Sequence, residues 1–249
     1  MIMTKTEQLT DMLRESSRIV FFGGAGVSTA SGIPDFRSAN GLYNQKYKRT
    51  LSPEEMVSHS FFVRDPEDFF DFYRDKLIYP EAQPNDCHKA LAALEKAGKL
   101  SAIVTQNIDG LHQKAGSKNV FELHGSVLRN YCTHCHKFFD ETAILKAQGV
   151  PKCDVCGGVI KPDVVLYEEM LDEDVMDGAA RAIMKADMLI IGGTSLVVYP
   201  AAGFVRYFRG KHLVLLNKST TQMDDEAELV IHDDIAKVLG DAVRAMGLM

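Results

Sequence analysis

The sequence predicts an α/β protein in which a doubly wound parallel sheet carries a second, smaller domain. Short, wholly apolar segments recur along the chain, and each ends in glycine or small polar residues. Helix-like segments lie between most of them, and strands that alternate with helices form parallel sheets buried on both faces. Two stretches interrupt this alternation, and one of them contains paired cysteines. These observations indicate a large sheet domain with insertions.

Composition and charge narrow the classes of function. The chain has 249 residues, of which 46% are hydrophobic and 25% charged, as in an ordinary globular protein. No apolar run approaches the roughly 18 residues of a membrane span, so we expect a cytoplasmic protein without membrane contact. A formal net charge of −6 argues against direct nucleic-acid binding, because phosphate backbones attract basic surfaces. We also expect a monomer.

The first expected elements are a helix and a buried strand. Thr4 and Glu7 have the spacing of a capping box, which predicts a helix over residues 4–17. Residues 19–22 are all apolar and run directly into glycines. A strand of this kind is expected in the middle of a parallel sheet.

The same strand pattern recurs later in the chain. Further apolar segments lie at residues 102–104, 120–123, 188–191 and 213–216. Helical patterns at 87–96 and 175–185 lie between them. The alternation predicts a Rossmann-like fold, in which ligands bind at the carboxyl ends of the strands. The polar residues that follow the strands are therefore candidates for one binding site.

We predict two domains from the breaks in this pattern. The Rossmann-like domain would comprise residues 1–32, 82–130 and 162–249. The smaller domain would comprise residues 33–81, a helical and aromatic-rich insertion, and residues 131–161, which contain the paired cysteines.

The paired cysteines predict a structural zinc site. Two C-x-x-C pairs are separated by seventeen residues, which is the spacing of a zinc ribbon. Four thiolates close a tetrahedral Zn²⁺ site and leave no position for a substrate, so the metal would be structural. The four ligands are Cys132, Cys135, Cys153 and Cys156.

Two histidines and the remaining cysteine are not expected to be functional. His134 and His136 could ligate zinc, but the four cysteines already complete the site, so we expect exposed loop histidines. Cys87 is the fifth cysteine, and we expect a packed thiol rather than a nucleophile.

A glycine-rich loop after the first strand predicts a phosphate site. Gly24, Ala25 and Gly26 can offer backbone N–H groups to a pyrophosphate, although Thr29 stands where a dinucleotide-binding loop usually has its third glycine. Polar residues at two other strand ends, Gly193-Thr194-Ser195 and Asn217, could surround the same dinucleotide. The acidic residue that binds ribose in dehydrogenases is absent from residues 42–51. The nucleotide is therefore expected to bind differently from a redox cofactor.

Two more polar clusters are open to alternative interpretations. Gln106, Asn107 and Asp109 could recognise a carboxamide or ribose hydroxyls, or could form an Asx turn that caps the helix beginning near Asp109. His124 could be a general base, or a histidine satisfied at a strand end.

Taken together, the motifs GAGVS, GIPDFRS, TQNID, LHG, GTSL and the C-x-x-C pairs resemble the sirtuin family of NAD-dependent protein deacylases. The resemblance extends in the same order from about Ile19 to Leu239. It implies NAD as co-substrate, structural Zn²⁺, and acylated lysines of proteins as substrates. The NAD contacts that it implies are Gly24, Ala25, Gly26, Thr29, Asp35, Phe36, Arg37, Gln106, Asn107, Ile108, Asp109, His124, Gly193, Thr194, Ser195, Asn217, Asp234 and Ile235.

The resemblance also implies a reaction. The acyl oxygen would displace nicotinamide from the ribose. His124 would then draw a proton from a ribose hydroxyl, which leads to release of O-acyl-ADP-ribose. Further catalytic residues would be Asn107 and Asp109. The substrate peptide would add as a strand between two segments. The residues implied to flank it are Val164, Val165, Tyr167, Leu196, Val197 and Val198.

Two departures from the family pattern affect substrate choice. Tyr167-Glu168-Glu169 stands where the family usually has phenylalanine-glycine-glutamate, which puts peptide affinity or preference in question. Tyr73 and Lys76 resemble the tyrosine and arginine of sirtuins that prefer acidic acyl groups, or are two helix-surface residues. The leading hypothesis is an NAD-dependent protein-lysine deacetylase. The alternatives are a desuccinylase, an ADP-ribosyltransferase, a Rossmann dehydrogenase and a zinc-ribbon binding module.

Overall fold

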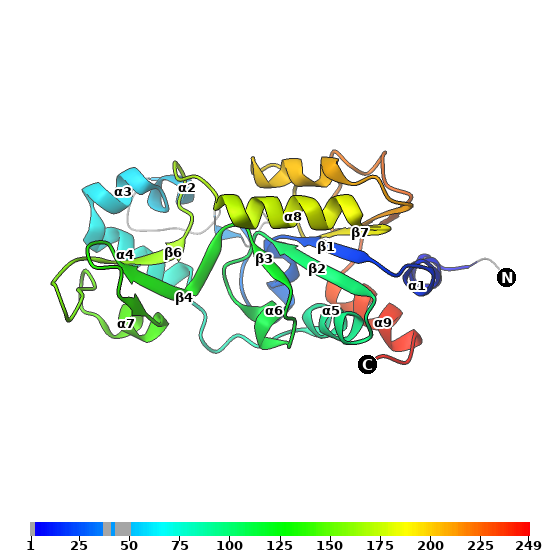
Figure 1. The fold of residues 1–249 in the computed structure, drawn as a ribbon, viewed down its shortest axis with the longest axis horizontal. Helices are drawn as coiled ribbons and strands as arrows, with labels where there is room; N and C mark the ends of the chain where they lie inside the picture. Colours follow the sequence, from blue (N-terminus) through cyan, green and yellow to red (C-terminus); the bar gives the residue numbers. More distant parts are fainter. Residues whose placement is uncertain (1–2, 37–40, 43–50) are drawn as a thin grey trace.

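The computed structural model describes residues 3–36, 41–42 and 51–249, and in that part of the chain it contains two sheets (Figure 1). The larger has six parallel strands in the order β3-β2-β1-β7-β8-β9, which is the doubly wound Rossmann order. Its strands are β1 (Ile19–Gly23), β2 (Leu100–Thr105), β3 (Val120–Glu122), β7 (Met188–Gly192), β8 (His212–Leu216) and β9 (Leu229–Ile231). The predicted fold class is confirmed.

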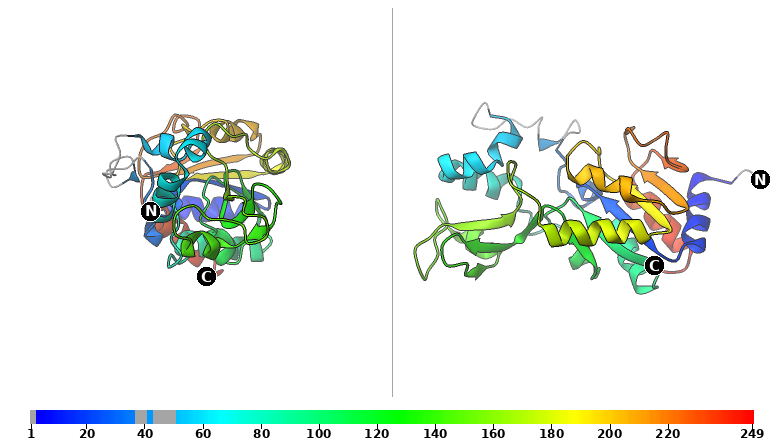
Figure 2. Two further views of the ribbon diagram at one scale, coloured as in Figure 1. Left: turned by 90° about the vertical axis from the view of Figure 1, so that its left-hand side faces the viewer. Right: turned by 45° about the horizontal axis from the view of Figure 1, so that its top comes forward.

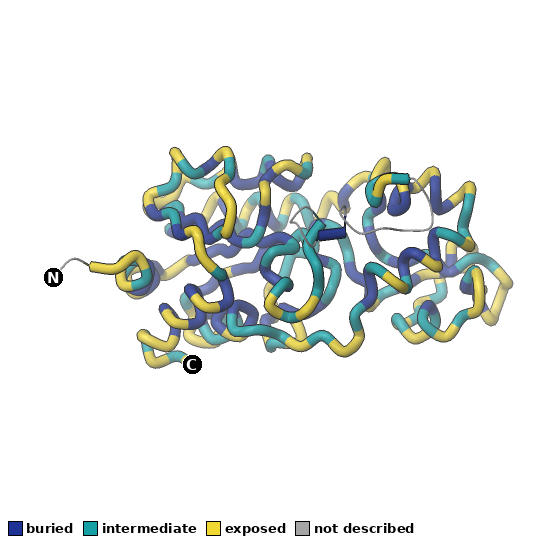
Figure 3. The backbone as a smooth tube through the Cα atoms, turned by 180° about the vertical axis from the view of Figure 1, so that it is seen from behind, coloured by how far each residue is buried: buried dark blue, intermediate teal, exposed yellow. Residues whose placement is uncertain are grey.

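The large sheet is buried on both faces. Along β1, Ile19 and Phe21 face one apolar cluster, and Val20 and Phe22 face another. The first cluster is completed by α1 (Lys5–Glu15), α5 (Asp86–Lys96) and α9 (Ile235–Ala245), and the second by α8 (Glu173–Lys185) and the 3-10 helix η4 (Ala201–Tyr207). Figure 1 shows α8 on one side of the sheet and α5 and α9 on the other. The central strands β1 and β7 are buried along their whole length, and dark blue tube runs through the middle of the large domain in Figure 3. Alternation of side chains between two covered faces explains why the central strands consist mainly of apolar residues.

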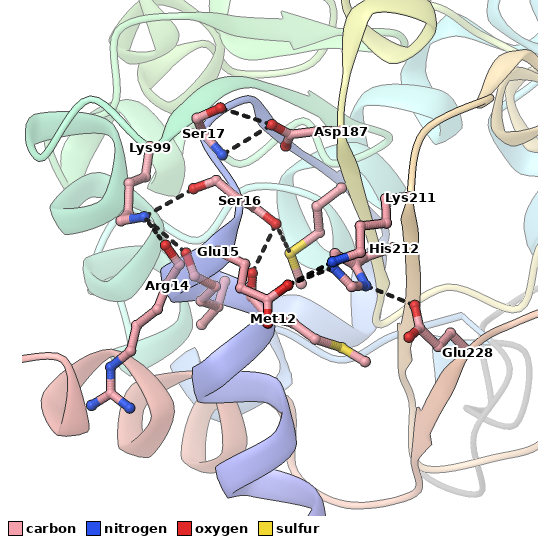
Figure 4. Close-up of polar contacts among 12 residues, drawn as sticks. Met12, Arg14, Glu15, Ser16, Ser17, Lys99, Asp187, Lys211, His212 and Glu228 are labelled. Carbon is pink, nitrogen blue, oxygen red and sulfur yellow. Dashed lines mark hydrogen bonds and ion pairs between the residues drawn. The ribbon is translucent and has the colours of Figure 1, made fainter.

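The edge of the sheet where the strands begin is held by charged side chains (Figure 4). The predicted capping box at Thr4 and Glu7 is present and starts α1. At the other end of α1, Lys99 Nζ donates to the carbonyl oxygens of Leu13, Arg14 and Ser16, at 2.8–3.0 Å. Asp187 accepts from the backbone N–H groups of the two residues that follow, Ser17 and Arg18. These contacts satisfy the backbone groups left unpaired at a helix end and at a strand start.

A second group of elements forms a small lobe, which we define as residues 51–81 and 125–166. It contains three helices, α2 (Pro53–Met56), α3 (His59–Arg64) and α4 (Pro66–Lys76). It also contains the antiparallel sheet β5-β4-β6, made of β4 (Gly125–Cys132), β5 (Phe138–Phe139) and β6 (Ile160–Val164), with α7 (Glu141–Lys146). The helices and the sheet share one core, in which Phe61, Phe69 and Tyr73 are buried with Val127 and Ile160. Figure 2 shows the small lobe at the end of the molecule away from α1 and α9.

Three elements differ from expectation. Strand β9 was not predicted, because a three-residue segment is too short to show a periodic pattern. Strand β4 begins at Gly125, so it crosses the predicted domain boundary at residues 130 and 131. The helix expected near Asp109 is the short α6 (Leu111–Lys114). The domain boundaries remain predictions. Among the described helices, none is both long and apolar enough to cross a membrane.

Candidate functional site

A cavity of about 900 Å³ lies at the carboxyl ends of the large sheet's strands and extends to the small lobe. It is lined by the residues that follow β1, β2, β7 and β8, by His124, and by Val57, Leu77 and Tyr79 of the small lobe. This position, at the point where the strand order reverses between β1 and β7, is where doubly wound proteins bind ligands. The volume suits a dinucleotide together with one end of a second substrate.

Two glycine loops lie against each other at the floor of this cavity. The N–H of Gly26, in the 3-10 helix η1 (Ala25–Val27), donates to the carbonyl oxygen of Gly193 at 2.8 Å. A Cβ atom on Gly26 would lie 2.8 Å from Gly193 Cα, and one on Gly193 would lie 2.4 Å from Val27 N. Gly193 also has a φ of 60°, a conformation that favours glycine. The loops can approach this closely only because both positions lack side chains.

The predicted amide and carboxylate cluster is built around a serine that sequence reasoning missed. Ser28 is buried, and its hydroxyl donates to Asp109 Oδ2 at 2.6 Å. Asn107 Nδ2 donates to the same hydroxyl oxygen at 3.1 Å. Asp109 Oδ1 also accepts from the N–H of Leu111, which is the Asx contact proposed as the alternative interpretation. The motif G-A-G-V-S itself contained the signal, because a hydroxyl in a phosphate-binding loop is a usual ligand group.

Burial controls the charge of Asp109. Loss of solvent raises the pKa of Asp109, while hydrogen bonds from Ser28 and Leu111 oppose that shift. Asp109, Asn107 and Ser28 all line the cavity. The cluster therefore presents an amide, a hydroxyl and a carboxylate to a bound polar group.

His124 lies between β3 and β4, where the chain passes from the large sheet to the small lobe. Its Nδ1 lies 2.9 Å from the backbone oxygen of Gln106. A carbonyl oxygen can only accept, so Nδ1 carries the proton and Nε2 keeps its lone pair. Burial lowers the pKa of His124, and the hydrogen bond to Gln106 opposes that shift. The ring is therefore a neutral imidazole with a free base nitrogen, beside the amide and carboxylate cluster.

The remaining polar strand ends are connected to one another. Gln106 Nε2 donates to Thr194 Oγ1 at 3.1 Å, and Asn217 Nδ2 donates to the carbonyl oxygen of Thr194 at the same distance. Asp234 accepts from two N–H groups at the start of α9 and forms an ion pair with Lys218 at 2.9 Å. These residues, with Ser195 and Ile235, all line the cavity, and most of them follow β7, β8 and β9.

Most of the other predicted contacts also line the cavity. On the β1 and β2 side these are Gly24, Ala25, Thr29, Asp35, Phe36 and Ile108, and on the substrate side Val164, Val165, Tyr167 and Val198. Leu196 is instead buried in the core, with 1% of its surface exposed, and Val197 is exposed outside the lining residues. Arg37 lies outside the described residues.

The residues that depart from the family pattern occupy distinct environments. Glu168 has a φ of 76°, and its carboxylate accepts two hydrogen bonds from Ser60 on α3. Tyr73 is fully buried in the small lobe and stacks on Phe69 with ring centroids 5.7 Å apart. Lys76 lines the cavity. Of the two candidate acyl-recognising residues, only the lysine therefore lies at the cavity.

The four predicted cysteine ligands converge in the small lobe. Their sulfur atoms all lie within 4.8 Å of one another, and the shortest separation, between Cys132 and Cys156, is 3.4 Å. Zn–S bonds of about 2.3 Å in a tetrahedron place sulfurs about 3.8 Å apart, so the cluster fits zinc. Backbone N–H groups of Cys135 and His134 point at Cys132 Sγ and lower the pKa of that thiol to about 6. A side chain at Gly158 would lie 2.8 Å from the same sulfur, which explains the glycine at that position.

The interpretations of the other three residues agree with the structure. His134 and His136 are exposed. Cys87 is fully buried in the core of the large sheet, and burial raises the pKa of its thiol. A buried thiol of this kind is unsuited to act as a nucleophile.

Comparison with known proteins decides the family. Residues 24–200 match the model of the Sir2 family. The chain belongs to this family. The resemblance to sirtuins inferred from the motifs is therefore confirmed, as is the expected zinc-ribbon and Rossmann-like architecture of such a protein.

Individual sirtuins are similar over nearly the whole chain. An NAD-dependent protein deacetylase of Clostridium perfringens is 68% identical over 96% of this chain and 98% of its own length. One of Clostridium acetobutylicum is 60% identical over the same shares. A structure of a Sir2 protein with deacetylated p53 peptide and 3'-O-acetyl ADP ribose has a TM-score of 0.88 at 40% identity, covering 99% of this chain and 100% of that one. A complex of Sir2 with p53 peptide and NAD+ has a TM-score of 0.85 at 38% identity over the same shares.

Proposed function

We propose that this chain is an NAD-dependent protein-lysine deacetylase that transfers the acetyl group to ADP-ribose and releases nicotinamide and O-acetyl-ADP-ribose. The observation that carries the proposal is the placement of His124. His124 lines the same cavity as the strand-end residues proposed to bind the nucleotide and as Val164 and Val165, which are proposed to bind substrate, and its Nδ1 contact with Gln106 leaves Nε2 as the base nitrogen. Relatives that share 68% and 60% of the sequence carry the deacetylase name, and related structures contain NAD+ or acetylated ADP-ribose.

The described residues fit NAD. The close-packed loops at Gly26 and Gly193 keep side chains away from this part of a cavity that is large enough for a dinucleotide. Asn107 and Asp109 would bind the carboxamide and ribose, and Thr194, Ser195 and Asn217 the adenosine half. When bound, NAD supplies the sugar carbon that takes up the acyl oxygen.

In this scheme the chain contributes orientation and one base. His124 Nε2 takes a proton from a sugar hydroxyl. The hydrogen bond from Nδ1 to the backbone oxygen of Gln106 fixes the orientation of the ring during this step. Val164, Val165 and Tyr167 would hold the substrate backbone as an added strand. The zinc site would hold the small lobe in shape and take no part in proton transfer, because its four thiolates leave no open ligand position.

Charge and cysteine chemistry bear on where the protein acts and on its partners. The sequence charge of −6 supports a protein that does not bind nucleic acid directly. The free thiols, including the four clustered ones, suit a reducing compartment such as the cytoplasm. We propose a monomer acting on acylated lysines of other proteins.

A direct test uses one lysine peptide in acetyl, butyryl and succinyl forms, with and without NAD, analysed by mass spectrometry. We expect NAD-dependent loss of the acetyl group and the appearance of O-acetyl-ADP-ribose. Transfer of ADP-ribose to the protein without loss of any acyl group would overturn the proposal in favour of an ADP-ribosyltransferase. Reduction of NAD to NADH would favour a dehydrogenase.

One observation keeps desuccinylation as a second candidate. Lys76 lines the cavity, and its ammonium group could pair with a succinyl carboxylate there. It already pairs with Asp75 at 3.1 Å, and Tyr73 is buried away from the cavity. We therefore expect acetyl to be preferred. Substitution Lys76→Ala should leave deacetylation unchanged, and a preference for succinyl that this substitution abolishes would instead establish the second candidate.

A further inference from the structure

Glu168 occupies a backbone conformation that a non-glycine residue rarely adopts. Its φ of 76° lies in the left-handed region, where a Cβ atom crowds the following carbonyl group. The residue before it is fixed by two hydrogen bonds, since the N–H of Tyr167 donates to the carbonyl oxygen of Val57 and the N–H of His59 donates to that of Tyr167. On the other side, the N–H of Glu169 donates to the carbonyl oxygen of Leu166. A glycine would adopt this φ without steric strain, so the presence of a glutamate at this position needs a separate explanation.

The carboxylate of Glu168 is held in one place by Ser60. Glu168 Oε2 accepts from the N–H of Ser60 at 2.8 Å and from its hydroxyl at 2.6 Å. Both hydrogen bonds favour the charged form and lower the pKa of Glu168. Oε1 makes no hydrogen bond to any residue in the described ranges. One carboxylate oxygen is thus anchored and the other is left for a partner.

The carboxylate of Glu168 is less fully paired than that of its neighbour: His59, when protonated, favours the charge on Glu168 but forms its ion pair with Glu169. Glu169 pairs with Lys161 at 3.0 Å and with His59 at 2.9 Å. Glu168 has no ion pair with any described lysine or arginine. Both glutamates line the cavity, but Glu168 is exposed and directly continues the segment 164–167 that the proposed function assigns to the substrate strand. A peptide on that segment would extend past a fixed, exposed negative charge.

We propose that Glu168 is a specificity-determining residue that favours substrates with a lysine or arginine close to the acylated lysine. This inference rests on the proposed deacetylase function. A cationic side chain of the peptide would reach the free Oε1, while an acidic one would meet like charge. Ser60 acts as the positioning residue, because without its two donors the strained backbone would not hold the carboxylate at the cavity rim.

The test compares matched acetyl-lysine peptides that carry lysine, alanine or glutamate on both sides of the acetyl-lysine. Deacetylation is measured at pH 8, where histidines are largely neutral, and at low salt, where exposed charges act most strongly. An exposed carboxylate pairing is typically worth a few-fold in affinity, so we expect kcat/KM for the lysine-flanked peptide to exceed that for the glutamate-flanked one by about fivefold or more. The preference should shrink at high salt.

Four variants separate charge from structure. Glu168→Gln and Glu168→Gly should both abolish the preference, although the first keeps the strained backbone and the second relieves it. Glu168→Lys should reverse it. Glu67→Gln removes an exposed carboxylate on α4 that does not line the cavity, and it should leave the preference intact. KM for NAD should be the same in all of them.

Two outcomes would overturn the inference. Equal kcat/KM for the three peptides with the wild-type enzyme would show that no such selection exists, and a preference that survives Glu168→Gln would assign it to another residue. Binding of the same peptides, fluorescently labelled and measured by anisotropy, is recorded in parallel. If no peptide is deacetylated, the proposed function fails, but charge-selective binding that Glu168→Gln removes would still support the role of Glu168.

Discussion

The Nδ1–H of His124 donates to a backbone carbonyl, and that contact determines which ring nitrogen can take up a proton. Substitution His124→Ala should lower kcat by about 10² to 10⁴, the usual contribution of a positioned general base. The side chain makes one hydrogen bond and packs at the cavity, so the unfolding midpoint and the zinc content should stay close to wild type. Peptide turnover, thermal unfolding and metal analysis of the same preparation check this. Wild-type turnover in the variant would remove His124 from the mechanism.

Other residues show the limit of sequence reasoning at this scale. The polar strand ends could be assigned to one site because parallel strands end at the same edge of a sheet. Sequence motifs say less about where a side chain points. Tyr73 was a candidate for acyl recognition, but α4 turns it toward Phe69 in the core. Ser28 was overlooked although it joins Asn107 to Asp109.

At the scale of elements, the joint between the large sheet and the small lobe depends on Gly125. It begins β4 directly after His124, has a φ of 73°, and faces β6 so closely that a Cβ atom would lie 1.9 Å from the carbonyl oxygen of Asp163. Gly125→Ala should therefore force β4 and β6 apart and cost about 3 kcal/mol or more of unfolding free energy. Activity should fall as well, because the displacement begins next to the catalytic base.

Gly149 provides the matched control for this prediction. It has a similar φ of 69°, but a Cβ atom there would have nothing within 4 Å. Gly149→Ala should lower the free energy of unfolding by only about 1 kcal/mol, the conformational cost of a left-handed alanine, and should leave activity unchanged. Urea unfolding and peptide turnover of both variants decide the matter, and equal destabilisation would show that backbone conformation, rather than contact with β6, limits residue 125.

A pair of buried histidines lies between helices α5 and α6, which flank the large sheet. His88 on α5 and His112 on α6 are at most 1% exposed, and their ring centroids lie 4.8 Å apart. Burial lowers the pKa of His88 to about 4, and burial together with the neighbouring His88 lowers that of His112 to about 3. Both rings must therefore be neutral in the folded protein at ordinary pH.

This pair predicts how stability depends on pH. Protons bind the unfolded histidines near pH 6.5 but the folded ones only at lower pH, so the stabilisation is complete above pH 6.5 and declines as the pH falls toward 4. The slope should reach about 1.4 kcal/mol per histidine for each pH unit in that range. Urea unfolding between pH 7.5 and 5 measures it. His112→Leu should reduce the slope by about half, and an unchanged slope would assign the acid sensitivity to other groups.

At the scale of the whole molecule, the fold was predictable because its signals are local and repeated. The central strands β2, β1, β7 and β8 are mostly apolar, are followed by small or polar residues and are largely buried, and the cysteine spacing alone indicated the zinc ribbon. The junction between the large sheet and the small lobe was harder to predict from the sequence. The sequence did not show that β4 would cross the predicted boundary, or that Glu168 would adopt a left-handed conformation with its carboxylate on α3, because both depend on contacts between segments about 30 to 110 residues apart.

The last prediction concerns the dependence of the small lobe on zinc. Cys132 and Cys153 are buried in the same core as Phe61 and Tyr73, so the helices α3 and α4 pack on a scaffold that the metal ties together. A structural zinc site contributes folding free energy directly. Chelation should therefore remove hydrogen-exchange protection from the small lobe, abolish deacetylation, and leave the central strands β1 and β7 protected. Readdition of Zn²⁺ should restore both. Persistence of turnover in protein shown by metal analysis to contain no zinc would contradict a structural role, since the small lobe forms part of the cavity wall through Val57 and Leu77.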